Sequence, residues 1–600
     1  MAPTAYIAPN AEEPFAKLQD TSIFHKKGAD VLNFAVGSKN GHSTIPRIPD
    51  FNTKEEERQY AKEHLACAFR VFAANGFDEG LSGHMSLRDP VEPNTFWINP
   101  YSMHFADITV SDLVRVTEEA EVIDGIHSVN AAGFAIHSEI HRAHPWVNAV
   151  CHAHSTAGKA FSVFGKPVAP LMQDALKFYN RQSILHEYHG PVLNTDEGKA
   201  IAAVIHEDTN MVILRNHGLL SIGTTIDEAC YWFTAFDRCC QAQLLIDAAS
   251  ATNGTPRPID EKTAGLDNEA GCISNPVTSA PVAADTASAT SKQSKLMTGE
   301  ERAQALMRNG QDRPLDVFTY GGYPLSGHQT KPVTQVRIPR FASLEDEREW
   351  RKLHHAAALR WLGMNGYNNE GAGGHVTVRD PILPNHFWIN PHGVSFSYMR
   401  PQDLCLVNEN GEVVEPGNMH AINPAGFSIH VAVHMARPDV VAACHCHSVP
   451  SKAFSALGCT LEPINQDACR FYEDHSIYES FGGAVLAHEE GQRIAKALGK
   501  NKAVILSSHG ILTVAKTVDA ATFLFGAMDR CIQAQLLADA AAAGRGTPTI
   551  KVSHEAAQFT HRVPTDEMEY VMFQSCFEDV VRASNGELKM HVPGELPRTD

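Results

Sequence analysis

The sequence repeats itself once, and this repeat restricts the fold more than any other feature of the chain. HMSLRDP at 84–90 matches HVTVRDP at 375–381, and DRCCQAQLLIDAA at 237–249 matches DRCIQAQLLADAA at 529–541. The offset between matched residues stays between 291 and 293. A unit of this length that is repeated once predicts two complete duplicated domains and excludes a solenoid of small units.

The segments outside the repeat have a different composition. Residues 251–295 are rich in Ala, Ser, Thr and Pro and poor in large apolar side chains, so we expect a flexible linker there. The two ends of the chain have no partner in the repeat, and they either pack as extensions or cover a neighbouring molecule. The predicted units are an N-terminal extension (1–50), a first domain (51–250), the linker (251–295), a connecting segment (296–341), a second domain (342–545) and a C-terminal extension (546–600).

Apolar spacing within each repeat alternates between the helical and the strand period. In the first repeat we expect helices over 54–77, 132–144 and 225–250, and strands over 84–88, 96–99, 147–154 and 210–215. This alternation predicts an α/β domain with helices packed on a central sheet.

Histidines stand at the ends of two of these predicted strands. Side chains two residues apart on a strand point to the same face, so His152 and His154 aim two imidazoles at one point. His217 follows another buried strand and precedes a glycine, where it can join the pair. A single pair of this kind is more often a solvated or core pair, but the second repeat keeps all three residues as His445, His447 and His509. We therefore predict two sites for a divalent metal ion, each with three His ligands and open positions for chemistry.

These motifs together resemble the class II aldolase and adducin superfamily. The resemblance is carried by AGF-x-IH at 132–137 and 425–430, the His-x-His strand ends, the third His before Gly and the QAQLL helix, and it covers nearly all of both repeats. It implies two α/β/α domains, each with a central, mainly antiparallel sheet and a metal held by three His. It also implies ring-shaped tetramers with sites between subunits, so two tandem chains would form a pseudo-tetramer. The ligands carried over are His152, His154 and His217, and then His445, His447 and His509.

The chain departs from the sugar-phosphate aldolases at the residues that do chemistry. The position of their acid/base Glu is held by Gly133 and Gly426, and their phosphate-binding Ser pair falls on Ala131–Ala132 and on 424–425. The resemblance therefore does not carry over the sugar-phosphate reaction. A non-phosphorylated carbonyl compound or 2-oxo acid is the substrate class we expect.

Other polar residues must then supply the proton transfer. His84 and His375 replace an Asn of the aldolases in a Gly-flanked turn, where each is a candidate base, a carboxylate ligand or a loop brace. Tyr179 and Tyr472 are candidate proton donors to an oxyanion, with simple packing as the alternative. His137 and His430, on the following helix, suit a supporting role.

The composition limits the classes of partner and the cellular compartment that we expect. The net charge of -19 argues against nucleic acid or an anionic membrane as the main partner. Thirteen cysteines scattered through apolar segments suit reduced thiols, and no long apolar stretch or leader is evident, so we expect a cytoplasmic protein. We expect a small-molecule substrate and a homo-oligomer.

Three hypotheses follow for function. The first is a metal-dependent lyase or isomerase with two divalent ions per chain, zinc or iron, with manganese and cobalt as alternatives. The second is a non-haem iron oxygenase on the same fold. The third is an adducin-like binding protein without catalysis, against which the two intact triads count.

Overall fold

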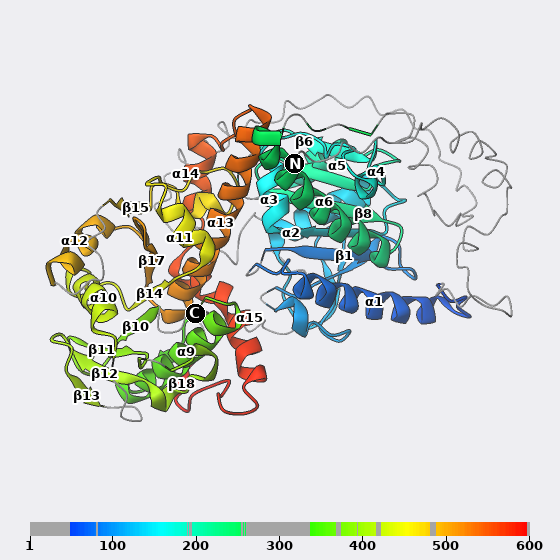
Figure 1. The fold of residues 1–600 in the computed structure, drawn as a ribbon. Coiled ribbons are helices and arrows are strands. Elements are labelled where there is room, and N and C mark those ends of the chain that lie inside the picture. The colour runs from blue at the N-terminus through cyan, green and yellow to red at the C-terminus, as the bar shows by residue number, and fades with distance from the viewer. Residues whose placement is uncertain are drawn as a thin grey trace, which may run out of the picture.

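The computed structural model describes residues 48–596 apart from 80–81, 102, 189, 191–194, 254–255, 257, 260–336, 368–373, 393, 416–421 and 480–487. Almost all of the predicted N-terminal extension, most of the predicted linker and most of the connecting segment lie outside the described residues. The two repeats form two separate sheets with their own helices, side by side in Figure 1.

The first repeat contains an eight-stranded sheet in the order β4-β3-β2-β1-β5-β8-β7-β6. Its neighbouring strands pair antiparallel except β6 and β7, which pair parallel. The strands are β1 (His84–Arg88), β2 (Thr95–Ile98), β3 (Val114–Thr117), β4 (Val122–Asp124), β5 (Ala149–Ala153), β6 (Gln182–Leu185), β7 (Met211–Leu214) and β8 (Gly218–Gly223). The helices are α1 (Lys54–Ala74), η4 (Phe105–Asp107), α2 (Ala131–Ala143), α3 (Thr156–Ser162), α4 (Gln173–Leu176), α5 (Thr195–Ala203) and α6 (Ile226–Asn253).

The second repeat has the same topology, in the order β13-β12-β11-β10-β14-β17-β16-β15, with β15 and β16 parallel. Its strands are β10 (His375–Arg379), β11 (His386–Ile389), β12 (Cys405–Asn408), β13 (Val413–Glu415), β14 (Ala442–Cys446), β15 (His475–Tyr478), β16 (Ala503–Leu506) and β17 (Gly510–Ala515). Its helices are α9 (Leu344–Met364), η5 (Phe396–Tyr398), η6 (Pro401–Asp403), α10 (Pro424–Ala436), α11 (Val449–Ser455), η7 (Ala468–Phe471), α12 (His488–Leu498) and α13 (Val518–Arg545).

Alternate residues of the central strands enter different cores, which explains their continuous apolar sequence. In β5, Val150 packs in a cluster with residues of α2 and α5, whereas Cys151 packs in a cluster with residues of α1 and α6. In β7, Val212 and Ile213 divide in the same way. A strand buried on both faces needs apolar side chains in both directions. The predicted α/β/α domains with a mainly antiparallel sheet are confirmed.

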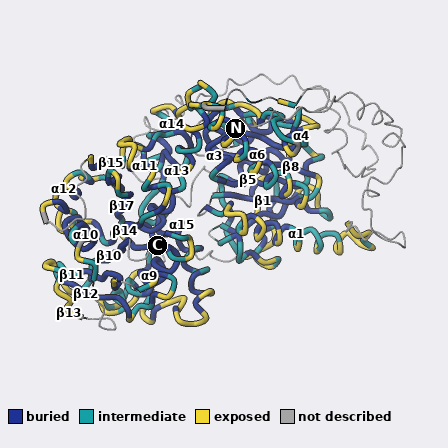
Figure 2. The backbone as a smooth tube through the Cα atoms, viewed as in Figure 1, coloured by how far each residue is buried: buried dark blue, intermediate teal, exposed yellow. Residues whose placement is uncertain are grey.

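The two repeats pack together through their long final helices. One face of α13 presents Ala534, Ala538 and Ala541, all fully buried, to the core of the first repeat. A methyl group on Gly544 would lie 1.6 Å from the backbone oxygen of Asp247 in α6, so only glycine permits this approach. The side chain of Asp247 accepts a hydrogen bond from Arg545 at 2.5 Å. Small residues thus let the repeats come close. Figures 1 and 2 show the two repeats side by side.

The C-terminal extension packs mainly against the second repeat. Helix α14 (His554–Arg562) lies on η7, and α15 (Asp566–Ala583) packs on α9 and α13. The short strand β18 (Glu595–Leu596) pairs with β9 (Arg340–Phe341). Among the described helices, none combines the length and the apolar composition that spanning a bilayer requires.

Candidate metal centres at two histidine triads

The first triad forms where three neighbouring strand ends meet. His152 lies in β5, His154 follows it directly, and His217 lies in the turn between β7 and β8. That turn is tight, with Asn216 at φ 59° and Gly218 at φ 158°. The ring centroids of the three histidines are 5.1, 4.9 and 4.9 Å apart, and one nitrogen of each lies within 4.8 Å of the others. The predicted three imidazoles therefore converge.

The second triad repeats this arrangement with more exposure. The ring centroids of His445, His447 and His509 are 4.9, 4.7 and 4.9 Å apart. The Nε2 atoms of His445 and His447 face each other at 3.0 Å, so both point at one spot. All three rings of the first triad are buried, whereas His447 and His509 are half-buried.

The tautomers and charges fit a metal ion. The backbone oxygen of Leu219 accepts a hydrogen bond from Nδ1 of His152 at 2.8 Å. The Nε2 atom of His152 is therefore unprotonated, and its lone pair is available to a metal ion in the triad. The backbone oxygen of Ile511 likewise accepts a hydrogen bond from Nδ1 of His445 at 2.8 Å. Burial lowers the pKa of His152 to about 3 and that of His509 to about 4, so both rings are neutral at pH 7. Neutral imidazoles with oriented lone pairs are the form that binds a divalent ion.

His84 and His375 lie beside the triads, as first residues of β1 and β10. Strand pairing sets His84 opposite His152 and His375 opposite His445, with ring centroids 5.5 and 6.1 Å apart. Nδ1 of His84 and both ring nitrogens of His375 are buried and have no hydrogen-bond partner among the described residues. Buried polar atoms are rarely unpaired, so these nitrogens are suited to a bound molecule.

These two rings also explain the glycines at the position of the aldolase Glu. A Cβ on Gly133 would lie 2.3 Å from Cδ2 of His84, and one on Gly426 would lie 2.2 Å from Cε1 of His375. Such approaches are far inside van der Waals contact. The imidazole therefore occupies the space that a side chain at this helix position would need, in both repeats.

A chain of hydrogen bonds supports His137 behind His84. Nδ1 of His141 donates to the backbone oxygen of Val147 at 3.2 Å, so its Nε2 accepts from the hydroxyl of Ser86 at 2.7 Å. The Ser86 oxygen then accepts from Nδ1 of His137 at 2.7 Å. This leaves Nε2 of His137 as a lone pair with no partner among the described residues, in a ring 5.6 Å from that of His84. In the second repeat, Thr377 bonds to His430 and His434 at 2.8 and 2.9 Å.

The two candidate proton donors, Tyr179 and Tyr472, have different surroundings. The hydroxyl of Tyr472 hydrogen-bonds to Nδ1 of His554, in α14, at 2.8 Å, while Tyr179 is half-buried in the turn after α4. Their proposed role as proton donors stays a prediction. Tyr188, which the sequence analysis did not single out, lies beside the first triad, with its ring 6.1 Å from that of His217. Its hydroxyl donates to Gln466 of the second repeat at 3.1 Å.

Residues of the second repeat also close the first triad. Nδ1 of His154 lies 3.0 Å from Oδ1 of Asp467, and Oδ2 of Asp467 accepts from Nζ of Lys159 at 2.8 Å. Lys159 is fully buried and forms a second ion pair with Glu79. Although burial acts in the opposite direction, Lys159 and His154 hold the pKa of Asp467 well below its usual range. The sequence signal for Asp467 was the repeated Gln-Asp-Ala motif, but nothing local told which histidine it reaches.

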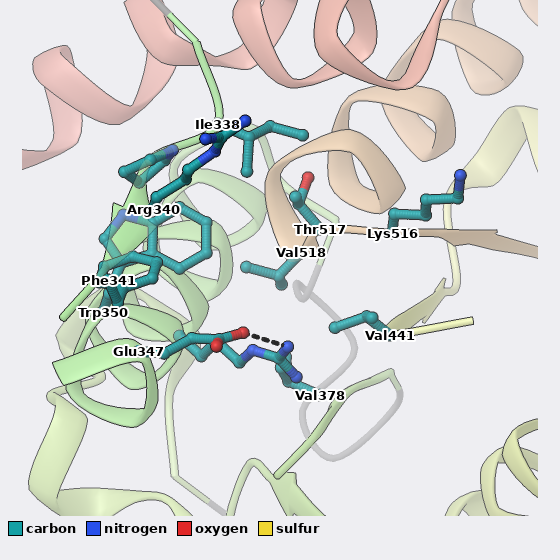
Figure 3. Close-up of a pocket in the computed structure, with 12 residues that line it drawn as sticks. Ile338, Arg340, Phe341, Glu347, Trp350, Val378, Val441, Lys516, Thr517 and Val518 are labelled. Atoms are coloured by element: carbon teal, nitrogen blue, oxygen red, sulfur yellow. Dashed lines mark hydrogen bonds and ion pairs between the residues drawn. The ribbon is translucent and has the colours of Figure 1, made fainter. Parts of the chain in front are cut away.

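The second repeat also contains a pocket of about 400 Å³, whose lining residues are drawn in Figure 3. Its lining includes Val378 near the end of β10 and Lys516 just after β17. The triad lies at the other ends of these strands, next to His375 and Gly510. Glu347 and Arg351 pair on its wall. The pocket is therefore separate from the metal centre.

The close approach of His84 to Gly133 gives a direct test. Gly133→Ala should destabilise the protein by about 1–3 kcal/mol, because the new methyl group overlaps the imidazole. In a His84→Ala background the same change should cost little, so the two effects should be strongly non-additive in thermal unfolding. Additive effects would contradict the packing of His84 over Gly133.

Comparisons with known proteins match both repeats. The model of the family described as "Class II Aldolase and Adducin N-terminal domain" matches residues 63–244 and 354–536, more than half of the chain. The meiotically up-regulated gene 14 protein of Schizosaccharomyces pombe is 49% identical over 204 residues, which are 34% of this chain and 79% of that protein.

Two Streptomyces proteins are also similar and carry enzyme names. The 4-hydroxy-3-prenylphenylpyruvate oxygenase/4-hydroxy-3-prenylbenzoate synthase of Streptomyces roseochromogenus is 41% identical over 39% of this chain and 84% of its own length. The decarboxylase NovR of Streptomyces niveus is 42% identical over 39% of this chain and 86% of its own.

A solved structure, the L-fuculose 1-phosphate aldolase from Glaciozyma antarctica PI12, is 38% identical with a TM-score of 0.38 and covers 42% of this chain and 97% of that one. The duplicated α/β/α fold and the match of the family model to both repeats lead to one conclusion: the chain belongs to the class II aldolase and adducin family, whose domain it carries twice.

Proposed function

We propose that this protein is a metal-dependent lyase or isomerase that acts on a small, non-phosphorylated carbonyl compound or 2-oxo acid. The observation that carries the proposal is the pair of histidine triads. Beside each triad a further histidine, His84 or His375, packs against the glycine that replaces the aldolase Glu. Two relatives above 40% identity support the substrate class, since one is named for a prenylphenylpyruvate and the other is named a decarboxylase. An aromatic 2-oxo acid is therefore the first compound to test.

The residues of the chain divide the work in this proposal. His152, His154 and His217 would hold one divalent ion, and His445, His447 and His509 a second. When bound, such an ion polarises a substrate carbonyl and stabilises the negative charge that develops on its oxygen. His84 and His375 would move the proton, because their unpaired ring nitrogens lie beside the triads. The hydrogen bond between Nδ1 of His137 and Ser86 orients the lone pair on Nε2 of His137. His137 would therefore position the ring of His84 or exchange a proton with it.

A non-haem iron oxygenase is the second candidate, favoured by the relative that is named an oxygenase. Three His ligands leave positions on Fe(II) for substrate and oxygen, so the ligand set suits this chemistry as well. An adducin-like binding role is the third, and the intact triads in both repeats count against it.

We also propose that two chains assemble into a ring of four repeats. The two repeats of one chain already pack through α6 and α13, which supports further packing between repeats of different chains. The partners expected are thus a small-molecule substrate and a second copy of the chain.

The metal content tests the triads. Protein purified without oxygen should contain two divalent ions per chain, zinc or iron, by elemental analysis. The double variant His152→Ala/His154→Ala should retain one ion, because the two triads share no ligand. His206→Ala, which removes an exposed histidine, should retain both. Loss of both ions from the double variant would contradict independent sites.

Turnover tests the proton-transfer residues. His84→Asn should lower the turnover of the first site by ~100-fold or more, the range for losing a general base, while the metal content stays unchanged. His375→Asn should do the same at the second site. The measurement is turnover of an aromatic 2-oxo acid in variants with the other triad removed.

The same assay separates the first two candidates when it is run with and without dioxygen. A lyase or isomerase should turn over equally in both conditions. Activity that needs dioxygen and survives the His84→Asn change would replace the lyase by the iron oxygenase.

A further inference from the structure

The pocket of about 400 Å³ in the second repeat takes no part in the chemistry proposed for the triads. It lies between β9, the first two turns of α9 and the start of α13. Seven of its twelve lining residues are apolar: Ile338, Pro339, Phe341, Trp350, Val378, Val441 and Val518. Figure 3 shows Phe341, Val441 and Val518 on different sides of one space, with the ion pair of Glu347 and Arg351 along another.

Two aromatic rings meet in the wall of this pocket. The ring centroids of Phe341 and Trp350 lie 5.4 Å apart, and Trp350 is only 4% exposed. The Trp350 ring also lies 4.3 Å from that of His354, whose Nδ1 is 2.6 Å from Oδ1 of the buried Asp519. The aromatic wall is therefore held by buried contacts, so a ligand does not have to order it on binding.

The sequence repeat provides an internal comparison for the pocket. RIPRF at 337–341, which contributes part of the lining, matches RIPDF at 47–51 in the first repeat. The aromatic pair is matched by Phe51 and Tyr60, whose ring centroids lie 5.2 Å apart. The two repeats therefore build this region on the same aromatic scaffold.

The charged residues around this scaffold differ between the repeats. Arg340 corresponds to Asp50, Arg351 to Ala61, Lys516 to Thr224, and Glu347 to Glu57. These four positions carry a formal charge of -2 in the first repeat, from two carboxylates, and of +2 in the second, from three cations and one carboxylate. In a chain whose net charge is -19, a pocket lined in this way favours a ligand that combines a negative charge with an apolar group.

Arg351 is the cation on the wall itself. Its Nη1 donates to the backbone oxygen of Arg379 at 2.6 Å, and its Nη2 pairs with Glu347. A guanidinium has five N–H donors, so these two contacts orient the group and leave it donors for a ligand. A carboxylate is the group that this planar donor set binds best.

The other two cations lie at the edge of the pocket. Arg340 and Lys516 are exposed, and Nζ of Lys516 lies 2.6 Å from Asp566 in an ion pair whose two side chains are both exposed. An exposed pair of this kind contributes little and exchanges readily with other partners. Helix α13, which begins at Val518, adds the positive end of its dipole at the same wall.

We propose that this pocket is a binding site for a small organic anion, a carboxylate on an aromatic or branched apolar group. The carboxylate would pair with Arg351, and the apolar group would pack against Phe341, Trp350 and the valines. A volume of about 400 Å³ accommodates a ligand of this size. The inference goes beyond the proposed function, because the pocket lies at the strand ends opposite the triad and needs no metal.

Calorimetry on the full-length, metal-free protein tests this site with phenylacetate as the probe. Removal of the metal with a chelator prevents the carboxylate from binding at the triads. One phenylacetate should bind per chain. Phenylacetamide has the shape without the charge, and inorganic phosphate has the charge without the apolar group. Each should bind at least about 10-fold more weakly, because each loses one of the two kinds of contact.

Exchanging each cation for the residue of the first repeat measures its contribution. Arg351→Ala should weaken phenylacetate binding by about 10-fold or more, because it removes the paired donor. Arg340→Asp and Lys516→Thr should weaken it by a few-fold each, and this loss should disappear at high salt because it acts through the field. Lys500→Thr, which changes an exposed lysine outside the pocket, should have no effect.

Val441→Phe fills the pocket without changing a charge, so it should abolish phenylacetate binding. Thermal unfolding identifies variants that misfold, and Arg351→Ala and phenylacetamide decide the question without Val441→Phe if that chain misfolds. The inference is overturned if phenylacetamide binds as tightly as phenylacetate, or if folded Arg351→Ala or Val441→Phe protein binds like the wild type. Absence of phenylacetate binding to the wild type also overturns it and leaves the proposed metal sites untouched.

Discussion

Antiparallel pairing at the centre of each sheet is the constraint on which the two sites depend. Because β5 pairs with β1 on one side and β8 on the other, the start of β1, the end of β5 and the turn before β8 meet at one edge. That edge carries His84, His152 and His217. Hydrogen bonds of the ladder fix the backbone at His84 and His152, and the tight turn between β7 and β8 brings His217 beside them. The second sheet repeats this register residue by residue.

A missing side chain is as important to the site as the histidines. Gly133 and Gly426 each face an imidazole at a distance that excludes a Cβ. The acid/base group of the family's sugar-phosphate enzymes and the imidazole of His84 or His375 are therefore alternatives for the same volume, which gives a physical reason for expecting a different reaction.

Much of this arrangement could be predicted from the sequence because it follows local periodicity. Alternation along a strand placed His152 and His154 on one face, and the repeat showed that the pattern was not accidental. The family resemblance supplied the sheet topology. The contact of Asp467 with His154 could not be predicted, because it depends on how two folded repeats pack, which in turn depends on small residues such as Gly544. The same holds for Tyr188, whose hydroxyl is held by a residue 278 positions away.

X-ray absorption at the metal edge tests the central claim, that each triad holds an ion through three imidazoles. Protein loaded with two equivalents of zinc should show imidazole nitrogen scattering from about three ligands per ion at about 2.0–2.1 Å and no sulfur scattering. A shell of sulfur atoms at about 2.3 Å, or oxygen ligands without the imidazole signature, would contradict the account.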